Sequence, residues 1–261
     1  MKYGFIGCGN MGGAIAKALS QTTKDILLAD ATDKAAILAK ELGCSYADNQ
    51  TVVSSCDRIF LAVKPQIMAE VLKPLQPLFK EKKPLIITMA AGLTLARIEE
   101  MIGTSLPIIR IMPNTPVSVN SGMILYCCNS LVDNAVLQDF LQDTTPCGQW
   151  DNLEEDLIDA AGVVSGCGPA YMYMFLDALA KGAENCGVPR QKALSYAAAT
   201  MIGAAKMVQQ DGRTPEELKN AVCSPGGSTI AGVHALEDGH FAETIMDCVQ
   251  KAYKRNQELG K

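Results

Sequence analysis

Residues 3–19 read YGFIGCGNMGGAIAKAL, and this stretch decides the fold of the N-terminal half of the chain. A short apolar run, residues 3–7, predicts a strand that ends in a cluster of glycines. Apolar residues between positions 11 and 19 then recur at the spacing of one helix face. Gly7, Gly9 and Gly12 therefore lie between a strand and a helix, the context of the dinucleotide-binding fingerprint. There a tight turn brings the backbone close to a pyrophosphate at a helix N-terminus; a glycine turn without a ligand is the alternative.

More apolar runs follow, and they predict a parallel sheet. Strands are expected at residues 26–29, 58–63, 85–89 and 108–112, with a further one at 123–127, and helical stretches such as 34–42 separate most of them. Nearly continuous apolar strands that alternate with helices are typical of a parallel sheet covered on both faces. Ligands of such sheets bind beyond the carboxyl ends of the strands, where all the N-terminal loops considered below lie.

The pattern changes near residue 151, where strand signals cease. Helices are predicted at residues 153–161, 170–186, 189–210, 215–222, 229–238 and 242–259. We therefore predict an α/β fold: a dinucleotide-binding domain built on a parallel sheet, residues 1–151, and an all-helical domain, residues 152–261. About 110 residues of apolar helices rich in small side chains offer little core of their own, so we expect a dimer to bury the remaining faces.

The composition limits the function classes. The chain has 261 residues, 48% hydrophobic and 20% charged, the balance of a globular protein with a sizeable core. A net charge of -5 without a basic cluster argues against nucleic acid as a partner. Residues 160–176 carry no charge, but glycine and proline at 166–169 interrupt them, which argues against a membrane span. A strand beginning at Lys2 argues against a signal peptide, so we expect a cytoplasmic protein.

The chain has ten cysteines and two histidines. No two cysteines form a C-x-x-C pair, so the spacing of a structural metal site is absent and no metal is expected. In a cytosolic protein, we expect these cysteines to be reduced and buried thiols.

Asp30 ends the second predicted strand, 18 residues after Gly12. A carboxylate at this place suits hydrogen bonds to the ribose hydroxyls of NAD and repels the 2′-phosphate of NADP. Lys34, one helical turn later, partly offsets that repulsion. The residues thus indicate a slight preference for NADH, with a polar residue at a helix start as the alternative.

Three loops add candidate contacts. Lys64-Pro65 and residues 113–116, PNTP, are rigid turns at strand ends, and Asn114 can both donate and accept hydrogen bonds to an amide or a ribose. Near the C-terminus, residues 224–229 read SPGGST, where two glycines allow unusual backbone angles and Ser228 or Thr229 can cap the next helix. Exposed N–H groups at a helix start bind carboxylates, although the loop can also be a cap and nothing more.

The glycine motif at residues 7–12 and the loop at residues 224–229 lie at opposite ends of the chain, and together they predict a two-domain enzyme with its active site between the domains. Together, the motifs resemble those of the pyrroline-5-carboxylate reductase family over essentially the whole length. The matching pieces are GCGNMG at 7–12, AVKP at 62–65, AAG at 90–92, RIMPNTP at 110–116, SGCGPAY at 165–171 and SPGGST at 224–229.

The resemblance implies a Rossmann-type domain and a helical dimerisation domain, with intertwined homodimers that often assemble into decamers. It implies reduction of Δ1-pyrroline-5-carboxylate to L-proline with NADH or NADPH, the last step of proline biosynthesis. By position it assigns cofactor contacts to Cys8, Gly9, Asn10, Met11, Asn49, Ala62, Val63, Lys64, Pro65, Ala90, Ala91 and Gly92. It assigns the substrate loop to Ser224, Pro225, Gly226, Gly227, Ser228 and Thr229.

In the same resemblance, the hydroxyl of Thr229 meets the ring nitrogen of the substrate. Three positions depart from the family pattern: Cys167 replaces a common serine, Gly162 a usual threonine, and Ser228 occupies a variable position. These departures bear on affinity rather than on the reaction.

The substrate motifs contain no His, Lys, Asp or Glu, which indicates that no strong dedicated acid acts there. We expect an iminium protonated in solution to be reduced, with Thr229 orienting its nitrogen or relaying a proton from water. Hydride then passes from C4 of the nicotinamide to the imine carbon, and N–H groups near residues 226–229 hold the carboxylate. Catalysis would come mainly from proximity and alignment.

Two other functions fit parts of the pattern. The first is another two-domain reductase, such as a hydroxyacid dehydrogenase or a different imine reductase. A hydroxyacid dehydrogenase would use a lysine of the second domain as acid and base, and Lys181 and Lys206 are candidates by type. A non-catalytic NAD-sensing protein would bind the dinucleotide and reduce no imine. Activity on a 2-hydroxy acid would favour the first, and binding without turnover the second.

Overall fold

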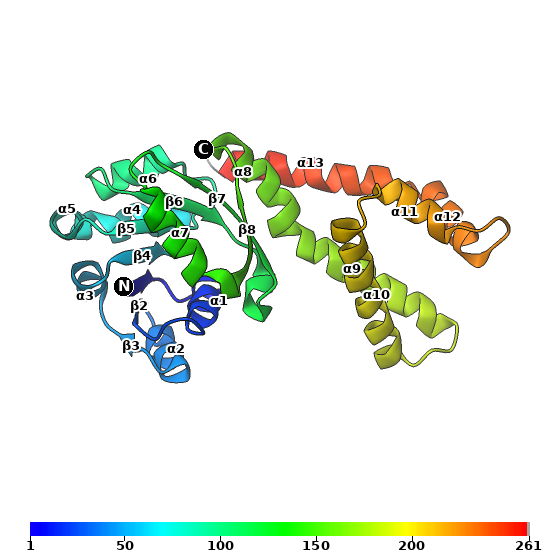
Figure 1. Ribbon diagram of the computed structural model, residues 1–261, viewed down its shortest axis with the longest axis horizontal. Helices are drawn as coiled ribbons and strands as arrows, with labels where there is room; N and C mark the ends of the chain where they lie inside the picture. Colours follow the sequence, from blue (N-terminus) through cyan, green and yellow to red (C-terminus); the bar gives the residue numbers. More distant parts are fainter. Residues whose placement is uncertain (260–261) are drawn as a thin grey trace. The chain divides into compact units, whose positions relative to one another are not determined.

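Figure 1 presents the computed structural model, which describes residues 1–259. The chain forms two compact units. The first holds Met1–Pro169 and the described end of the chain from Ala252, and the second holds Ala170–Lys251. This division falls later than residue 151 because α8, Glu155–Gly162, packs on strand β7, Gly122–Cys128, of the sheet. The boundary at 151 between functional domains stays a prediction.

An eight-stranded sheet forms the centre of the first unit, in the order β3-β2-β1-β4-β5-β6-β7-β8. The strands are β1 Tyr3–Ile6, β2 Ile26–Ala29, β3 Ser45–Tyr46, β4 Arg58–Leu61, β5 Leu85–Thr88, β6 Ile108–Met112, β7 Gly122–Cys128 and β8 Gly148–Asn152. All neighbouring strands pair in parallel except β6 and β7, which are antiparallel. The predicted parallel sheet is therefore confirmed from β1 to β6, and its last two strands run in the reverse direction.

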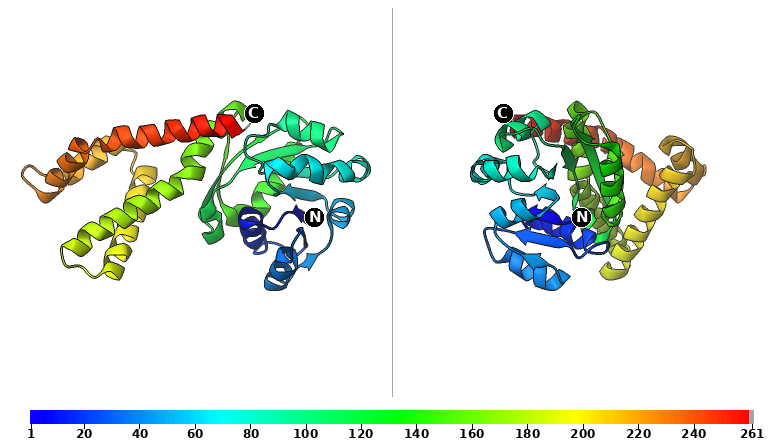
Figure 2. Two further views of the ribbon diagram at one scale, coloured as in Figure 1. Left: turned by 180° about the vertical axis from the view of Figure 1, so that it is seen from behind. Right: turned by 60° about the vertical axis from the view of Figure 1, so that its left-hand side comes forward.

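Helices cover both faces of this sheet, as the views in Figure 2 show. Helices α1, α2 and α7 pack on one face, and α3, α4, α5 and α6 pack on the other. Their bounds are α1 Asn10–Leu19, α2 Lys34–Leu42, α3 Asn49–Ser55, α4 Pro65–Leu72, α5 Gln76–Lys82, α6 Leu95–Ile102 and α7 Asn134–Asp143. Within residues 1–259, short 3-10 turns lie between other elements at Lys73–Leu75, Thr115–Val119 and Thr145–Cys147, and a π-helical turn follows α8 at Val163–Cys167.

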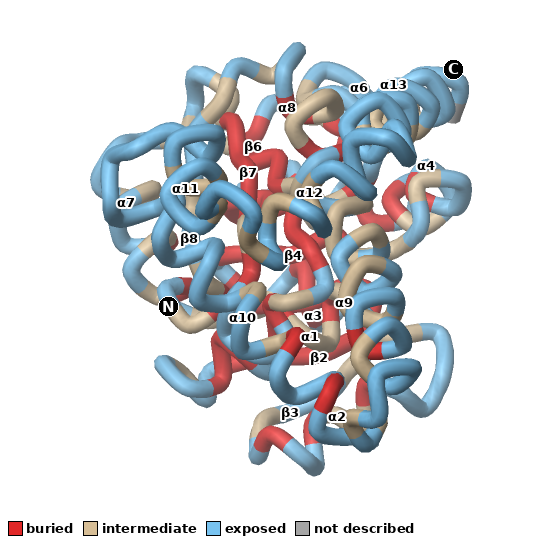
Figure 3. The backbone as a smooth tube through the Cα atoms, turned by 90° about the vertical axis from the view of Figure 1, so that its right-hand side faces the viewer, coloured by how far each residue is buried: buried red, intermediate tan, exposed pale blue. Residues whose placement is uncertain are grey.

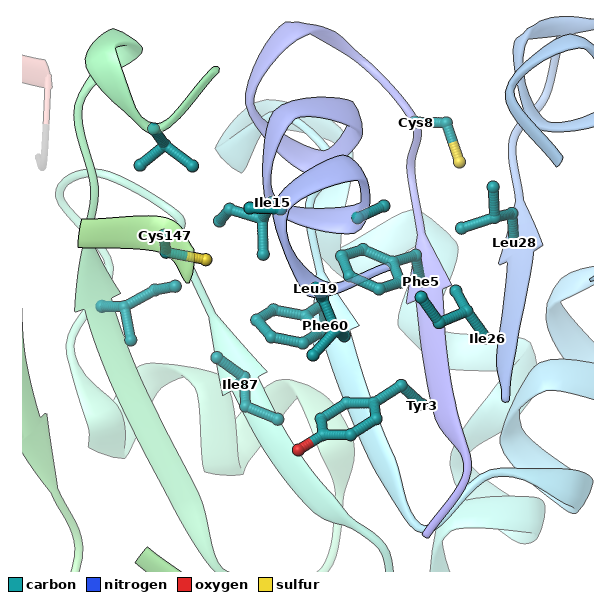
Figure 4. Packing of buried hydrophobic residues seen from close by; sticks show 14 of the residues in the cluster. Tyr3, Phe5, Cys8, Ile15, Leu19, Ile26, Leu28, Phe60, Ile87 and Cys147 are labelled. Carbon is teal, nitrogen blue, oxygen red and sulfur yellow. The ribbon is translucent and has the colours of Figure 1, made fainter. Parts of the chain in front are cut away.

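Alternation along the strands supplies both faces with apolar side chains. Phe5 of β1 and Phe60 of β4 stack with ring centroids 4.5 Å apart, and Ile6 points to the opposite face. Figure 4 shows Phe5 and Phe60 between Ile15 and Leu19 of α1 and Tyr3 of β1. Because the central strands are covered on both faces, they are buried along their length, as Figure 3 shows in red. Their nearly unbroken apolar sequence follows from this position.

Two strands were not predicted. β3 has only two residues, and both are exposed. β8 alternates polar and half-buried residues at the edge of the sheet, and Gly148 begins it with a φ of +128°. A Cβ at Gly148 would lie 2.5 Å from the Gly122 nitrogen, so the two strands approach closely at that point. Neither strand carries the apolar run that marks a buried strand.

An ionic network around the buried Arg58 side chain ties α7 to the amino ends of β1 and β4. The Arg58 side chain is 2% exposed, and its Nη1 lies 2.9 Å from Asp143 Oδ2. The same nitrogen donates to the Tyr3 hydroxyl at 2.5 Å, and that hydroxyl donates to Asp143 Oδ2 at 2.6 Å. Burial is the main cause that raises the pKa of Tyr3 above its usual value, so the hydroxyl stays protonated.

The second unit is built from helices alone. It includes most of α9 Gly168–Asn185 and α13 Phe241–Leu259, and all of α10 Arg190–Gln210, α11 Pro215–Val222 and α12 Ser228–Asp238. These bounds confirm the predicted helices to within two residues. At α11, Thr214 and Glu217 form a reciprocal capping box, and Pro215 occupies the first turn. Among residues 1–259, no helix combines the length and the apolar character needed to span a bilayer.

Candidate dinucleotide and substrate sites

The glycine loop follows β1 and packs tightly against the end of β4. Gly7 has a φ of +103°, and a Cβ there would lie 2.7 Å from the carbonyl carbon and oxygen of Ala62. A Cβ at Gly12 would lie 2.5 Å from the Gly7 carbonyl oxygen and 2.8 Å from the Ala62 Cβ. Contacts this short would displace the backbone, so both positions require glycine.

Helix α1 presents an open N-terminus at this loop. It begins at Asn10, and its N-cap, Gly9, has no side chain that could cap it. The first hydrogen bond of the helix runs from Gly13 N–H to the Gly9 carbonyl oxygen at 2.8 Å. The N–H groups of the three residues before Gly13 therefore have no acceptor within the helix. These groups lie at the positive end of the helix dipole. They form an anion site that fits the pyrophosphate of a dinucleotide.

Asp30, at the end of β2, is bonded to this loop. Its Oδ2 accepts a hydrogen bond from Cys8 N–H at 2.7 Å, and its Oδ1 accepts from the N–H and the hydroxyl of Thr32 at 2.9 and 2.7 Å. Partial burial by itself raises the pKa of the Asp30 carboxyl, but these bonds and the charge of Lys34 outweigh it, so the pKa is lowered. Asp30 is therefore ionised at neutral pH.

A pocket of about 370 Å³ opens beside the glycine loop. Residues of α1 and α2 and Ser118 line it, among them Asn10, Lys17, Lys34 and Glu41. Lys17 lies 2.9 Å from Glu41, so its charge is paired across the two helices. Lys34 is the cation that the sequence placed one turn after Asp30, and it faces the same pocket as the loop.

The other predicted cofactor loops reach the same edge of the sheet. Strands β1 to β6 are parallel, so their carboxyl ends share one edge, and the strand order reverses on either side of β1. Such a switch point is where doubly wound sheets bind ligands. The structure thus brings together the glycine loop, Asp30, Asn49 and the loops 62–65 and 90–92.

Local geometry differs among these loops. Lys64 is exposed as the N-cap of α4, and Pro65 occupies the first position of that helix. Gly92 has a φ of +74°, which favours glycine. Asn49 begins α3, whose N-cap Asp48 accepts from Thr51 N–H at 2.7 Å.

The side chain of Asn114 is engaged within the protein. Its Nδ2 donates to the Ser165 carbonyl oxygen at 3.0 Å, and its Oδ1 accepts from Met123 N–H at 2.9 Å. The amide thus joins the end of β6 to β7 and to the π-helical turn. Its predicted contact with the cofactor stays a prediction, and a bound dinucleotide would compete with these bonds.

Two supporting groups escaped the sequence reasoning. Glu155 of α8 is the first. Its Oε1 accepts a hydrogen bond at 2.6 Å from the N–H of Leu95, which lies just after the loop 90–92, and the same oxygen accepts from Nη1 of Arg110 at 3.2 Å. Arg110 is buried in β6 and pairs with Asp159 at 2.6 Å as well. Thr32 is the other missed residue, and the Asp-x-Thr spacing after a strand is the turn signal that could have predicted its bonds to Asp30.

In the second unit, residues 224–227 form a tight turn. Gly227 N–H donates to the Ser224 carbonyl oxygen at 3.0 Å, and Gly226 has a φ of +70°. Proline at the second position and a left-handed glycine at the third are the signature of a type II turn. A Cβ at Gly227 would lie 2.5 Å from Ser224 Oγ, so the turn also restricts its fourth position.

The turn leads directly into α12, whose N-terminus is uncapped. Its N-cap is Gly227, and no side chain bonds to the first turn. The expectation that Ser228 or Thr229 caps this helix is wrong, because the helix begins at Ser228 and both residues lie inside the first turn. The first N–H groups of α12 are consequently open to an anion such as a carboxylate.

Thr229 is exposed and lines a large groove within the second unit. The groove has a volume of about 1010 Å³ between helices α9, α10, α12 and α13. Aromatic, aliphatic and small residues form its walls, with hydroxyls from Thr200, Thr229 and Thr244, and no charged side chain lines it. An isolated chain would leave this apolar surface in water, which is unfavourable.

The remaining reactive groups have ordinary surroundings. All ten cysteines are free, but only four are buried, so the expectation of buried thiols holds for Cys8, Cys56, Cys127 and Cys147 alone. Burial, followed by the charge of Asp30, raises the pKa of the Cys8 thiol to about 12, which keeps it protonated. Lys181 pairs with Asp177 at 2.7 Å. Within residues 1–259, no cluster of His, Cys, Asp or Glu could hold a metal ion.

Full-length relatives decide the family. The pyrroline-5-carboxylate reductase of Escherichia coli is 38% identical over 266 residues, covering 100% of this chain and 98% of the relative. Pyrroline-5-carboxylate reductase 3 of Danio rerio is 39% identical over 269 residues, covering 100% and 92%. The chain belongs to the pyrroline-5-carboxylate reductase family.

Two domain families match within this reductase. A model described as pyrroline-5-carboxylate reductase dimerisation matches residues 155–259, and one described as NADP oxidoreductase, coenzyme F420-dependent, matches residues 2–92. A crystal structure of Plasmodium falciparum pyrroline carboxylate reductase with NADP bound superposes with a TM-score of 0.91 at 30% identity, covering 100% of this chain and 98% of that one. The Rossmann-type fold with a helical dimerisation domain is therefore confirmed.

Proposed function

We propose that this protein reduces Δ1-pyrroline-5-carboxylate to L-proline with NADH or NADPH. The observation that carries the proposal is that the likeness to reductases of this name runs the full length of the chain. Both halves of the reaction thus have a counterpart here, the glycine loop for the dinucleotide and residues 224–229 for the imine.

The residues at the glycine loop fit a dinucleotide. Three N–H groups at the start of α1 receive the pyrophosphate, and the absence of side chains at Gly7 and Gly12 lets the turn pack closely. Cys8, Asn10, Met11, Asn49 and the loops 62–65 and 90–92 would contact the rest of the cofactor. The reduced nicotinamide supplies a hydride when it is bound.

The substrate loop binds a small anion through its backbone. The open first turn of α12 holds the carboxylate of the imine, and the hydroxyl of Thr229 lies on the same turn to meet the ring nitrogen. No charged residue lines the adjoining groove, so no side chain there is a strong acid. The nitrogen is therefore protonated by solvent or through Thr229, which acts as the catalytic residue.

Dimerisation accounts for the groove of the second unit. A groove of about 1010 Å³ without charged walls suits apolar helices of a second copy of this chain, in an intertwined homodimer that can assemble into a decamer.

The cofactor preference is slight and favours NADH, because the Asp30 carboxylate repels a 2′-phosphate while the charge of Lys34 reduces that repulsion. The protein acts in the cytoplasm on a small molecule, without nucleic acid or membrane partners.

The test is loss of absorbance by reduced nicotinamide with pyrroline-5-carboxylate, measured in parallel with NADH and NADPH. Turnover with a higher kcat/KM for NADH supports the whole proposal, and a higher value for NADPH removes the preference alone. Binding of dinucleotide without turnover of the imine would contradict the proposed reaction. Size measurement in solution tests the assembly separately.

A further inference from the structure

The Asp30 carboxylate is a structural part of the glycine loop. Cys8 N–H, which donates to Asp30 Oδ2 at 2.7 Å, lies 22 residues away in sequence. Cys8 is 6% exposed, and Figure 4 shows it at the end of β1 beside Leu28 of β2. Gly7 N–H next to it donates to the Ala29 carbonyl oxygen at 2.8 Å. Asp30 therefore extends the β1–β2 pairing by one bond, into the loop itself.

The same carboxylate has little acceptor capacity left. An ionised carboxylate offers about four acceptor sites on its two oxygens. Cys8 fills one site on Oδ2, and Thr32 fills two on Oδ1 through its N–H and its hydroxyl. One site remains, on Oδ2. A bidentate pair of bonds to two ribose hydroxyls, one on each carboxylate oxygen, would require one of the two Thr32 bonds to break.

Loss of this acceptor would leave a buried donor in the loop. Water reaches Cys8 poorly, so its N–H would have to move toward solvent or remain unpaired. Either change displaces the backbone between Gly7 and Gly9, next to the open end of α1. Binding of any dinucleotide would then include the cost of restoring the loop.

We propose that Asp30 is a positioning residue for the glycine loop, which holds Cys8 N–H and keeps a single acceptor site for one ribose hydroxyl. Its hydrogen bond to the loop supports NADH and NADPH equally, and only its charge distinguishes them. The inference rests on the proposed use of a dinucleotide. It gives Asp30 a role in holding the loop that is separate from the choice between NADH and NADPH.

The experiment separates the bond from the charge with two variants. Asp30→Asn and Asp30→Ala remove the same charge, but only asparagine retains an oxygen that can accept from Cys8 N–H. Binding of NADH and NADPH is titrated by nicotinamide fluorescence without imine, and thermal unfolding identifies the folded samples. We expect Asp30→Ala to bind both dinucleotides about tenfold more weakly than Asp30→Asn, within the range for a buried donor that loses its acceptor.

A positioning role also predicts that, relative to Asp30→Asn, Asp30→Ala loses the same factor in affinity for NADH and for NADPH, since the bond to Cys8 N–H does not distinguish the two cofactors. A general folding defect would lower kcat and leave the dissociation constants of the folded fraction unchanged. Equal affinities of the two variants for both cofactors would overturn the inference. Wild-type protein that binds dinucleotide but reduces no pyrroline-5-carboxylate would contradict the proposed reaction only, and wild-type protein that binds neither dinucleotide would overturn both.

Discussion

Replacing Gly12 by alanine should destabilise the first unit and weaken dinucleotide binding together. The new Cβ would lie 2.5 Å from the Gly7 carbonyl oxygen and 2.8 Å from the Ala62 Cβ. One of these neighbours is backbone and the other is a short side chain at the end of β4, so neither can rotate away. The strain has to be relieved by moving α1 away from β1 and β4.

The expected cost is about 1–3 kcal/mol, the usual penalty for an extra methyl group in a packed region. For a unit of about 150–250 residues this corresponds to a fall of about 2–12 °C in melting temperature. Gly13→Ala is the matched control, because its Cβ would meet Leu38 and Cys8 at 3.6 and 3.7 Å, which is ordinary contact. Alanine is favoured over glycine in a helix by about 1 kcal/mol, so this control should melt at or above the wild-type temperature.

Gly9→Ala completes the series. A Cβ at Gly9 meets nothing within 4 Å, and the residue has an extended backbone with a φ of -68°. This variant should keep wild-type stability, yet bind NADH and NADPH more weakly because its methyl group stands where the pyrophosphate approaches. Thermal unfolding and fluorescence titration of the three variants check the argument. A Gly12→Ala protein as stable as wild type, with Gly13→Ala less stable, would refute the packing described for this turn.

Three further outcomes are expected. Thr229→Ala should lower kcat about tenfold or more while the KM for dinucleotide is unchanged, and Thr229→Ser should restore turnover. Steady-state kinetics measure both constants, and an unchanged kcat in the alanine variant would contradict the proposed role of Thr229. Because the pKa of Asp30 is lowered, the stabilisation of the fold by its carboxylate is complete above the ordinary carboxyl pKa of about 4 and is lost as the pH falls further through the folded-state pKa. The advantage of wild type over Asp30→Asn in melting temperature should therefore be constant from neutral pH down to about pH 4 and then vanish. An advantage that persists in acid would contradict this. Asp143→Ala should lower the free energy of unfolding in urea by about 2–3 kcal/mol, because Arg58 stays buried without its partner. Asp139 lies 3.9 Å from Arg58 and its side chain is 64% exposed, so Asp139→Ala should lower that free energy by less than about 1 kcal/mol. Equal losses in the two variants would show that Arg58 does not depend on Asp143.

The sequence predicted the elements of this fold well because their causes are local. Apolar runs marked β1, β2, β4, β5 and β6, and helical periodicity marked all six C-terminal helices to within two residues. It could not predict that β7 runs antiparallel to β6, since the direction of a strand depends on its connection and on its partner. β8 escaped notice because an edge strand needs few apolar residues.

The candidate site was predicted as a set of loops, and the parallel strands explain why those loops share one edge. Side-chain partners were beyond reach. The acceptor of Cys8 N–H lies 22 residues away, and the two partners of the Asn114 amide lie 9 and 51 residues away. Such bonds depend on tertiary packing, which no local pattern contains. For Asn114, the structure replaces a free amide with one that already joins three segments.

The network of Tyr3, Arg58 and Asp143 has a practical consequence for changing this protein. Tyr3 and Arg58 occupy the amino ends of β1 and β4, and Asp143 ends α7, whereas the glycine loop and the loop 62–65 follow the carboxyl ends of the same two strands. Reinforcing the amino end, for instance by repacking around Arg58, should raise thermal tolerance without altering affinity for the dinucleotide. Enzyme engineers would thus have one end of each strand for robustness and the other for chemistry.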